Sequence, residues 1–177
     1  MDRNVYADHA LTIARHPSET DERMMVRLLA FALHVPADDH AGMLELGKGL
    51  SDTDEPDLWQ RDLTGVITHW IEVGQPDERT LLRASGRAAR VSVYAYSAAV
   101  PIWWSGIAGK LARAANLDAW QLPAAQSQAL AELAQQFDVH PNQITQWRGQ
   151  LLEGATAVFG DGAKADAAPA VDLKVLH

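Results

Sequence analysis

Cysteine is absent from the chain. A disulfide framework, a thiolate zinc site and a cysteine nucleophile are therefore excluded. A bound metal would have to rest on carboxylates or histidines, and no pair among the seven histidines has the spacing of a helix-borne zinc site. We therefore expect the histidines to have surface or capping roles.

Basic residues are also in short supply, with 15 Lys and Arg against 23 Asp and Glu and a formal net charge of -8. Affinity for phosphate groups comes mainly from clustered cations, so this balance argues against DNA binding over the whole surface and leaves only a local patch open. A glycine-rich phosphate loop and a G-x-S-x-G sequence are missing too. Nucleotide hydrolysis and serine hydrolase chemistry are therefore unsupported.

Long apolar segments are missing as well. No run reaches the roughly 18 apolar residues of a membrane span, and the first residues lack the basic-then-apolar order of a secretion signal. The sequence therefore indicates neither a membrane partner nor export, and we expect a cytoplasmic protein. With 177 residues, 47% hydrophobic and 21% charged, the chain fits one globular domain with a small appendage.

The first half of the chain predicts a helix followed by strands. Residues 17–34 start with Pro, Ser and acidic residues and continue with an apolar stripe at helical spacing, which predicts an amphipathic helix. Residues 43–52 are typical of a short strand ending in a turn, and the acidic, proline-interrupted stretch 52–57 predicts a loop. Residues 65–73, GVITHWIEV, are β-branched and aromatic without a helical period, which predicts a largely buried strand.

The second half continues with helical and strand patterns in turn. A helix is predicted from Pro76 to Ala88, because proline suits an early helical position and acidic residues follow it. A strand, a helix and a strand are then predicted over 90–97, 101–116 and 117–123. The order of these elements indicates an α/β fold with a mixed sheet flanked by helices.

Two acidic residues stand at strand positions in this arrangement. Asp57 follows Pro56 at the head of the strand region, and Glu72 lies near the end of the buried strand. A metal-dependent nuclease needs carboxylates that converge on Mg²⁺, together with a cation that steadies the charge on phosphate. A glutamate within WIEVG is also costly to bury unpaired. The spacing leaves two alternatives open, which are metal binding and a simple ion pair of Glu72 with Arg79 or Arg83.

Ordered blocks of sequence over residues 1–135 resemble the YaeQ family of small bacterial proteins, among them GLSDTDEPDLW, WIEVGQPDERTLLRASGRA and VYAYSAAVPIWW. The resemblance implies a restriction-endonuclease-like fold of the PD-(D/E)XK superfamily. Asp57 then corresponds to the PD element and Glu72 to the acidic residue of the (D/E)XK element. Both would be catalytic residues and ligands of Mg²⁺, and the implied activity is metal-dependent processing of nucleic acid.

The sequence departs from the superfamily pattern at the lysine. The expected position, two residues after Glu72, holds Gly74, and relatives carry a lysine on the next helix where this chain has Arg83. A guanidinium can hold phosphate through two hydrogen bonds but does not shuttle a proton near neutral pH. Arg83 therefore completes the predicted catalytic set without replacing the chemistry of lysine. Glu22 is a third carboxylate, which either approaches the same cleft or stays solvated in the first helical turn.

Family members have further strand residues before the position that matches Met1 and further strands after the position that matches Gln135. The resemblance therefore implies a nuclease-like sheet that is truncated at both ends. A sheet that loses its edge pairing exposes backbone and apolar surface. This predicts either instability or a homodimer formed through the exposed sheet edge.

Residues 130–153 have the spacing of a helix-turn-helix, with Pro141 at the start of the second helix. A helical hairpin packed on the α/β domain stays open as the alternative. The segment ELAQQFDVHPNQITQWRGQLLEG resembles the DNA-binding region of OrfA-type proteins of insertion sequences, and the resemblance implies a transposase fragment. The residues of the second helix that would contact nucleic acid are Asn142, Gln143, Thr145, Gln146 and Arg148.

The sequence thus predicts three parts. They are a YaeQ-like domain over 1–129, an all-α helix-turn-helix over 130–153, and a flexible, mostly disordered tail over 154–177. Three functional hypotheses follow. The chain processes nucleic acid with Mg²⁺, or binds DNA through the helix-turn-helix, or is the product of a gene fusion without a present function.

Overall fold

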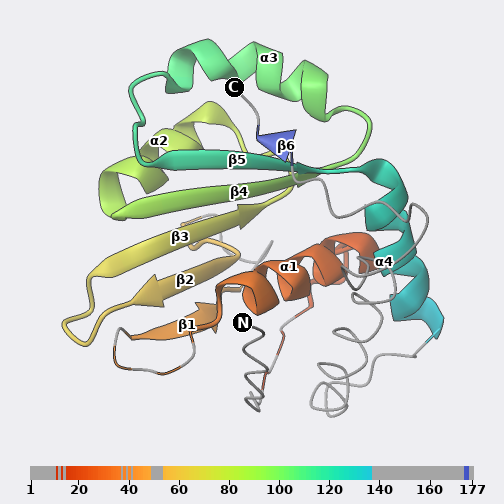
Figure 1. Ribbon diagram of the computed structural model, residues 1–177, viewed down its shortest axis with the longest axis horizontal. Helices are drawn as coiled ribbons and strands as arrows, with labels where there is room; N and C mark the ends of the chain where they lie inside the picture. The colour runs from red at the N-terminus through yellow and green to blue at the C-terminus, as the bar shows by residue number, and fades with distance from the viewer. Residues whose placement is uncertain are drawn as a thin grey trace, which may run out of the picture.

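The computed structural model describes residues 11, 13, 15–36, 38, 40, 42–48, 54–136 and 174–175. These residues form four helices and a six-stranded sheet in the order β1-β2-β3-β4-β5-β6. Figure 1 shows the strands side by side, with α1 and α4 next to each other. The elements are α1 (Asp21–His34), β1 (Met43–Leu46), β2 (Leu58–Arg61), β3 (Ile67–Val73), α2 (Glu78–Arg87), β4 (Arg90–Tyr96), α3 (Val100–Leu111), β5 (Leu117–Leu122), α4 (Ala124–Gln136) and β6 (Lys174–Val175).

The sheet combines antiparallel and parallel pairing. β1, β2 and β3 pair antiparallel and follow one another in sequence. β3, β4 and β5 pair parallel, and α2 and α3 provide the two crossovers that parallel neighbours require. β6 pairs antiparallel with β5. The predicted mixed sheet flanked by helices is therefore confirmed.

Helix α1 begins where the sequence supplies a cap. The Thr20 side chain accepts a hydrogen bond from the backbone N–H of Arg23. Acidic residues follow in the first turn, where the positive end of the helix dipole favours them. The helix ends before Val35, which has an extended ψ of 122° and precedes Pro36.

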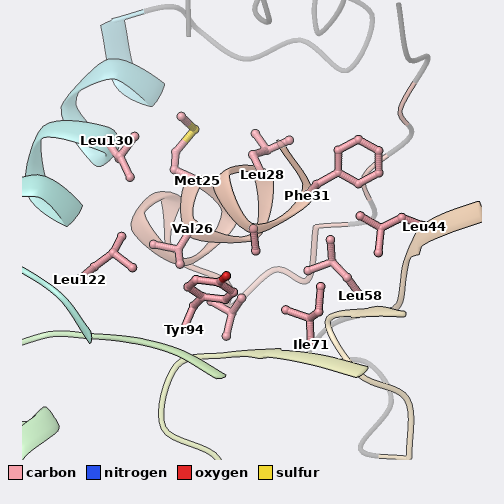
Figure 2. Close-up of a cluster of buried hydrophobic side chains, with 12 residues drawn as sticks. Met25, Val26, Leu28, Phe31, Leu44, Leu58, Ile71, Tyr94, Leu122 and Leu130 are labelled. Atoms are coloured by element: carbon pink, nitrogen blue, oxygen red, sulfur yellow. The ribbon is translucent and has the colours of Figure 1, made fainter. Parts of the chain in front are cut away.

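Alternation along β3 sends neighbouring side chains to opposite faces of the sheet. Ile71 and Val73 belong to the cluster that packs against α1 and α4, whereas Trp70 packs with Ala84 of α2 on the other face. The first cluster is the main core. Figure 2 labels its larger members, which are Met25, Val26, Leu28, Phe31, Leu44, Leu58, Ile71, Tyr94, Leu122 and Leu130.

Each helix and strand predicted between residues 17 and 123 has a counterpart in the structure, but strand β2 was not predicted. Its four residues, LWQR, carry no clear alternation of their own. Pairing on both sides stabilises the strand, and Gly42 and Gly47 allow β1 to come close. A Cβ atom on Gly47 would lie 2.0 Å from the carbonyl oxygen of Pro56, and one on Gly42 would lie 1.7 Å from that of Arg61.

The last residues require a correction to the predicted flexible tail over 154–177. Lys174 pairs with Gln121 and Val175 pairs with Trp120, so this part of the tail forms β6. Without such pairing the outer edge of β5 would present free backbone donors and acceptors, and a short added strand satisfies some of them. The other tail residues lie outside the described part of the chain.

Helix α4 passes through the predicted boundary at residues 129 and 130 without a break. Leu130 is buried in the main core with residues of α1 and the sheet. The predicted second helix of the helix-turn-helix lies outside the described residues. No helix in the described part of the chain is long and apolar enough to cross a membrane.

Because Leu130 is buried, the Leu130→Ala variant should lower the free energy of unfolding by about 2–4 kcal/mol, the range for deletion of a large buried aliphatic side chain. Glu132→Ala on the exposed side of α4 is the matched control and should change stability by less than about 0.5 kcal/mol. Urea denaturation followed by circular dichroism measures both. Equal effects would show that α4 does not belong to the cooperative core.

Candidate functional site

The two predicted carboxylates lie at the ends of neighbouring strands. Leu58 at the start of β2 pairs with Ile71, so Asp57 lies one residue beyond this pair, next to Glu72 and Val73. Asp57 is 2% exposed and Glu72 is 8% exposed. The structure therefore brings this part of the predicted site together, in a largely buried position.

Asp57 is held by two arginines of α1. Arg23 donates to both carboxylate oxygens of Asp57, with Nη2 at 2.7 Å from Oδ1 and 2.8 Å from Oδ2. Arg27 Nε lies 3.4 Å from Oδ1, and the backbone N–H of Val73 donates to Oδ2 at 2.7 Å. The carboxylate thus links the first helix to the sheet through charge-assisted hydrogen bonds.

Glu19, just before α1, is the second acid bound to these arginines. Arg27 Nη1 lies 3.1 Å from each Glu19 carboxylate oxygen, and Arg23 Nη1 lies 2.9 Å from Oε1. Arg27 also donates to the carbonyl oxygen of Gly47 at 2.9 Å. Glu19, Arg23, Arg27 and Asp57 form a group that we call the buried ion network, and it has as many acids as bases.

The network offsets part of the electrostatic cost that burial creates. Burial raises the pKa of Asp57, and this pKa stays above its usual value although the guanidiniums of Arg23 and Arg27 oppose the rise by favouring the ionised carboxylate. Burial lowers the pKa of Arg23, but the charges of Asp57 and Glu19 more than compensate and leave that pKa raised. Each member is thus stable as an ion only while its partners are present.

Glu72 has a different environment from Asp57. The indole Nε1 of Trp70 donates to Glu72 Oε1 at 2.8 Å. Burial raises the pKa of Glu72 to about 7, and the nearby charge of Asp57 adds to the rise. The Trp70 hydrogen bond and the charges of Arg23 and Arg83 oppose it. Glu72 is therefore a carboxyl group poised between its neutral and ionised forms.

Arg83 takes a more peripheral position than predicted. It forms an ion pair with Asp54, with 2.6 Å between Nη1 and Oδ1, and the Asp54 side chain is 75% exposed. It acts on Glu72 through its charge. The predicted alternative of an ion pair of Glu72 with Arg79 or Arg83 is not found among the described residues, where Arg83 pairs with Asp54 and Glu72 accepts a hydrogen bond from the Trp70 indole.

The composition of the site can be tested against a hard divalent cation such as Mg²⁺. Such a cation takes oxygen ligands and often keeps several waters beside one or two carboxylates. Asp57 and Glu72 supply two carboxylates, and among the described residues Glu72 accepts one side-chain hydrogen bond, from Trp70. No group of three or more His, Asp or Glu with metal-binding geometry occurs in the described part of the chain. The donor types fit a two-carboxylate site, although Arg23 contacts both oxygens of Asp57.

Sequence reasoning missed Glu19, Arg23 and Arg27, which complete this site. Arg23 and Arg27 are four residues apart on a helix, and they flank the apolar residues that the helical stripe placed in the core. Their place beside the apolar stripe was the signal in the sequence that could have identified these two arginines as partly or fully buried. Glu22, the predicted third carboxylate, is half-buried in the first turn of α1, and it is Glu19 that contacts the arginines.

A second polar cluster lies between α1, β3 and β4. The imidazoles of His34 and His69 meet edge to face, with centroids 4.6 Å apart. His34 Nε2 lies 2.6 Å from the hydroxyl of Tyr94, and His69 Nε2 lies 2.8 Å from the hydroxyl of Ser92. The general expectation of surface or capping roles does not extend to His69, which is a buried residue of β3 with its ring nitrogen hydrogen-bonded to Ser92.

Protonation of this cluster is unfavourable near neutral pH. Burial lowers the pKa of His69 to about 4, with further lowering by His34 and Arg90 and a smaller opposing effect of Asp118. Burial and Arg90 also lower the pKa of His34, and burial raises that of Tyr94 to about 12. The buried hydrogen bonds thus involve neutral side chains.

The predicted contacts with nucleic acid lie outside the described residues. They are Asn142, Gln143, Thr145, Gln146 and Arg148. Their assignment stays a prediction.

Removing one cation from the buried ion network should be costly. Arg27→Met leaves two buried carboxylates with one guanidinium, and the expected loss of stability is about 3–5 kcal/mol. The control is Arg90→Met, because Arg90 and Asp118 form a half-exposed pair worth less than about 1 kcal/mol. The midpoints and slopes of urea denaturation give the free energy of unfolding of the two variants. A loss of stability in Arg27→Met as small as that in Arg90→Met would contradict a stabilising role of the network.

His69 should make stability depend on pH. Its pKa falls from 6.5 in the unfolded chain to about 4 in the folded protein, so the unfolded state binds more protons between these values. The stabilisation is complete above pH 6.5 and is lost as the pH falls toward 4, by about 3 kcal/mol at most.

The contribution of Glu72 to stability changes with pH in the opposite direction to that of His69. Because the pKa of Glu72 is raised, its contribution to stability is lost as the pH rises from 4.5 to about 7. The difference between the wild-type chain and His69→Gln isolates the histidine. Thermal unfolding at half-unit pH steps should show this difference constant above pH 6.5 and shrinking below it. A difference that does not change with pH would mean that His69 titrates normally.

Several known proteins are similar to this chain in sequence and in fold. The curated relatives include the “Uncharacterized protein YaeQ” of Salmonella typhi, which is 47% identical over 135 residues covering 76% of this chain and 72% of the relative. The protein of the same description from Escherichia coli (strain K12) is 46% identical over 123 residues, covering 69% of this chain and 65% of the relative. This chain thus spans about two thirds of the length of the Escherichia coli protein.

Two solved structures have a similar fold. The YaeQ protein from Xanthomonas axonopodis pv. citri matches with a TM-score of 0.65 at 50% identity, over 72% of this chain and 70% of that protein. The YaeQ protein from Pseudomonas syringae matches with a TM-score of 0.62 at 42% identity, over 68% of this chain and 64% of that protein. The sequence model of the family described as “YaeQ protein” matches residues 1–151, further than the resemblance over 1–135 had indicated. The chain belongs to the YaeQ family.

Proposed function

We propose that this chain has a nuclease-like site of PD-(D/E)XK type, in which Asp57 and Glu72 bind a divalent cation for hydrolysis of a phosphodiester bond in nucleic acid. The proposal rests on the environment of Glu72. This nearly buried carboxyl group lies beside a second carboxylate and accepts a hydrogen bond from a neutral indole. Within the described part of the chain no cation forms an ion pair with it, and a bound metal ion would supply a charge partner.

The position of the pair in the fold supports the proposal. Asp57 precedes β2 and Glu72 is near the end of β3, and the charge of Asp57 raises the pKa of Glu72. Perturbed carboxyl groups that influence each other are a frequent property of catalytic sites. Two carboxylates on rigid, paired strands also suit a metal that keeps water ligands.

The roles of the residues follow from their chemistry. A divalent cation supplies a Lewis acid and lowers the pKa of a bound water. Asp57 and Glu72 would hold it, and Arg83 would contact a phosphate oxygen once it left its exposed partner Asp54. Because a guanidinium does not give up a proton near neutral pH, Arg83 would orient phosphate and would not act as a base.

Glu72→Gln is the variant that tests the site. The glutamine side chain has nearly the same shape and keeps an oxygen that accepts from the Trp70 indole, so the fold should persist. It loses the charge that a hard cation requires. We expect Mn²⁺ binding in calorimetry, and any Mg²⁺-dependent cleavage of DNA or RNA, to be lost in this variant.

Glu45→Gln is a matched control, because Glu45 is an exposed residue of β1 and the variant changes charge equally. It should bind Mn²⁺ as the wild-type chain does. The proposal would fail if Glu72→Gln retained full Mn²⁺ affinity, or if the wild-type chain bound no divalent cation at all.

DNA binding by the predicted helix-turn-helix is the second proposal, and a gene-fusion product without a present function is a separate third hypothesis. The spacing of residues 130–153 supports the first of these. Two findings favour the alternative of a packed helical hairpin. Leu130 faces the main core, and the YaeQ family match continues to residue 151. Gel-shift measurements with Arg148→Ala would separate DNA binding from simple packing.

A further inference from the structure

Arg23 occupies the side of Asp57 that a cation would use. Its Nη2 lies 2.7 and 2.8 Å from the two carboxylate oxygens, so one donor bridges both of them. Its charge also acts on Glu72. Resting on the proposed metal site, we infer that Arg23 is an exchangeable cation, which neutralises Asp57 in the metal-free protein and must move away when a divalent cation binds.

The two arginines of the buried ion network differ in their capacity to leave. The Arg27 side chain is fully buried and is fastened to both oxygens of Glu19 and to the Gly47 carbonyl. The Arg23 side chain is 13% exposed. A guanidinium at the solvent boundary regains hydration when it moves out, whereas a fully buried one does not. Arg23 is therefore the member that can exchange.

The network keeps its remaining contacts after such an exchange. Arg27 still binds Glu19 and lies near Asp57, and the backbone N–H of Val73 still donates to Asp57. Helix α1 therefore stays attached to the sheet. Arg23 is in the first turn of the helix, so its long side chain can change rotamer without movement of the backbone.

Charge balance favours a divalent occupant. With Arg23 in place, the carboxylates of Glu19 and Asp57 face two guanidiniums, and the buried ion network is neutral. With Arg23 displaced, one negative charge is in excess, and the ionised form of Glu72 adds a second. A divalent cation between Asp57 and Glu72 then makes the site neutral, which a monovalent guanidinium does not achieve.

Calorimetric titration with MnCl₂ tests the inference directly. Arg23→Gln removes the competing charge, and its Mn²⁺ dissociation constant should fall about tenfold, equivalent to ~1.4 kcal/mol. Arg23→Lys keeps a charge but has a compact ammonium that does not reproduce the guanidinium geometry, so a smaller gain is expected. If circular dichroism shows that Arg23→Gln folds poorly, Arg23→Lys is the variant that tests the inference.

Arg113→Gln is the matched control, because Arg113 is an exposed residue between α3 and β5, away from the end of β3. It loses the same charge and should leave Mn²⁺ affinity unchanged. The inference is overturned if wild-type affinity is unchanged or weakened in both Arg23 variants, since Arg23 would then be purely structural or would help to bind the metal. If no chain, variant or wild type, binds Mn²⁺ in a way that depends on Glu72, the proposed function fails together with the inference.

Discussion

The charge of Asp57, buried beneath the first helix, is the constraint on which the structure depends. A carboxylate in this position is tolerated only with cations beside it, and α1 supplies them as Arg23 and Arg27. Glu19 balances the second cation, and the Gly47 carbonyl accepts from the buried one. The network thereby connects the start of α1 with the β1–β2 connection and the end of β3, and sets where the helix crosses the sheet.

The same network limits the chemistry of the site. Asp57 contributes to stability through contacts that would have to be rearranged for it to act as a ligand. Glu72 is held by an indole hydrogen bond and by no ion pair with a described residue. The buried ion network, which stabilises the fold, thus lies next to Glu72, the candidate reactive group. Metal binding and stability would therefore be coupled at one residue, Arg23, which contacts Asp57 and influences Glu72.

Local patterns predicted most of the fold, because they act within a few residues. The acidic first turn of α1, the apolar run of β3 and the proline near the start of α3 all have direct physical readings. The pairing of β6 with β5 joins segments far apart in sequence, so no local signal marked it. Strand β2 was missed because its four residues show no clear alternation. Asp57 and Glu72 were found through their motif. The two arginines that bind Asp57 come from helix α1, where Arg23 lies 34 residues before Asp57, and spacing does not reveal such contacts.

The most direct test of the account is to follow the side-chain Nε–Hε signals of Arg23 and Arg27 by nuclear magnetic resonance while Mg²⁺ is added. The two guanidiniums share the acids of one network but differ in exposure. We expect the Arg23 signal to shift and to exchange faster with water as the cation binds, and the Arg27 signal to keep its position and its protection. Signals that both stay unchanged at saturating Mg²⁺, or that both lose protection together, would contradict a network with one fixed and one exchangeable cation.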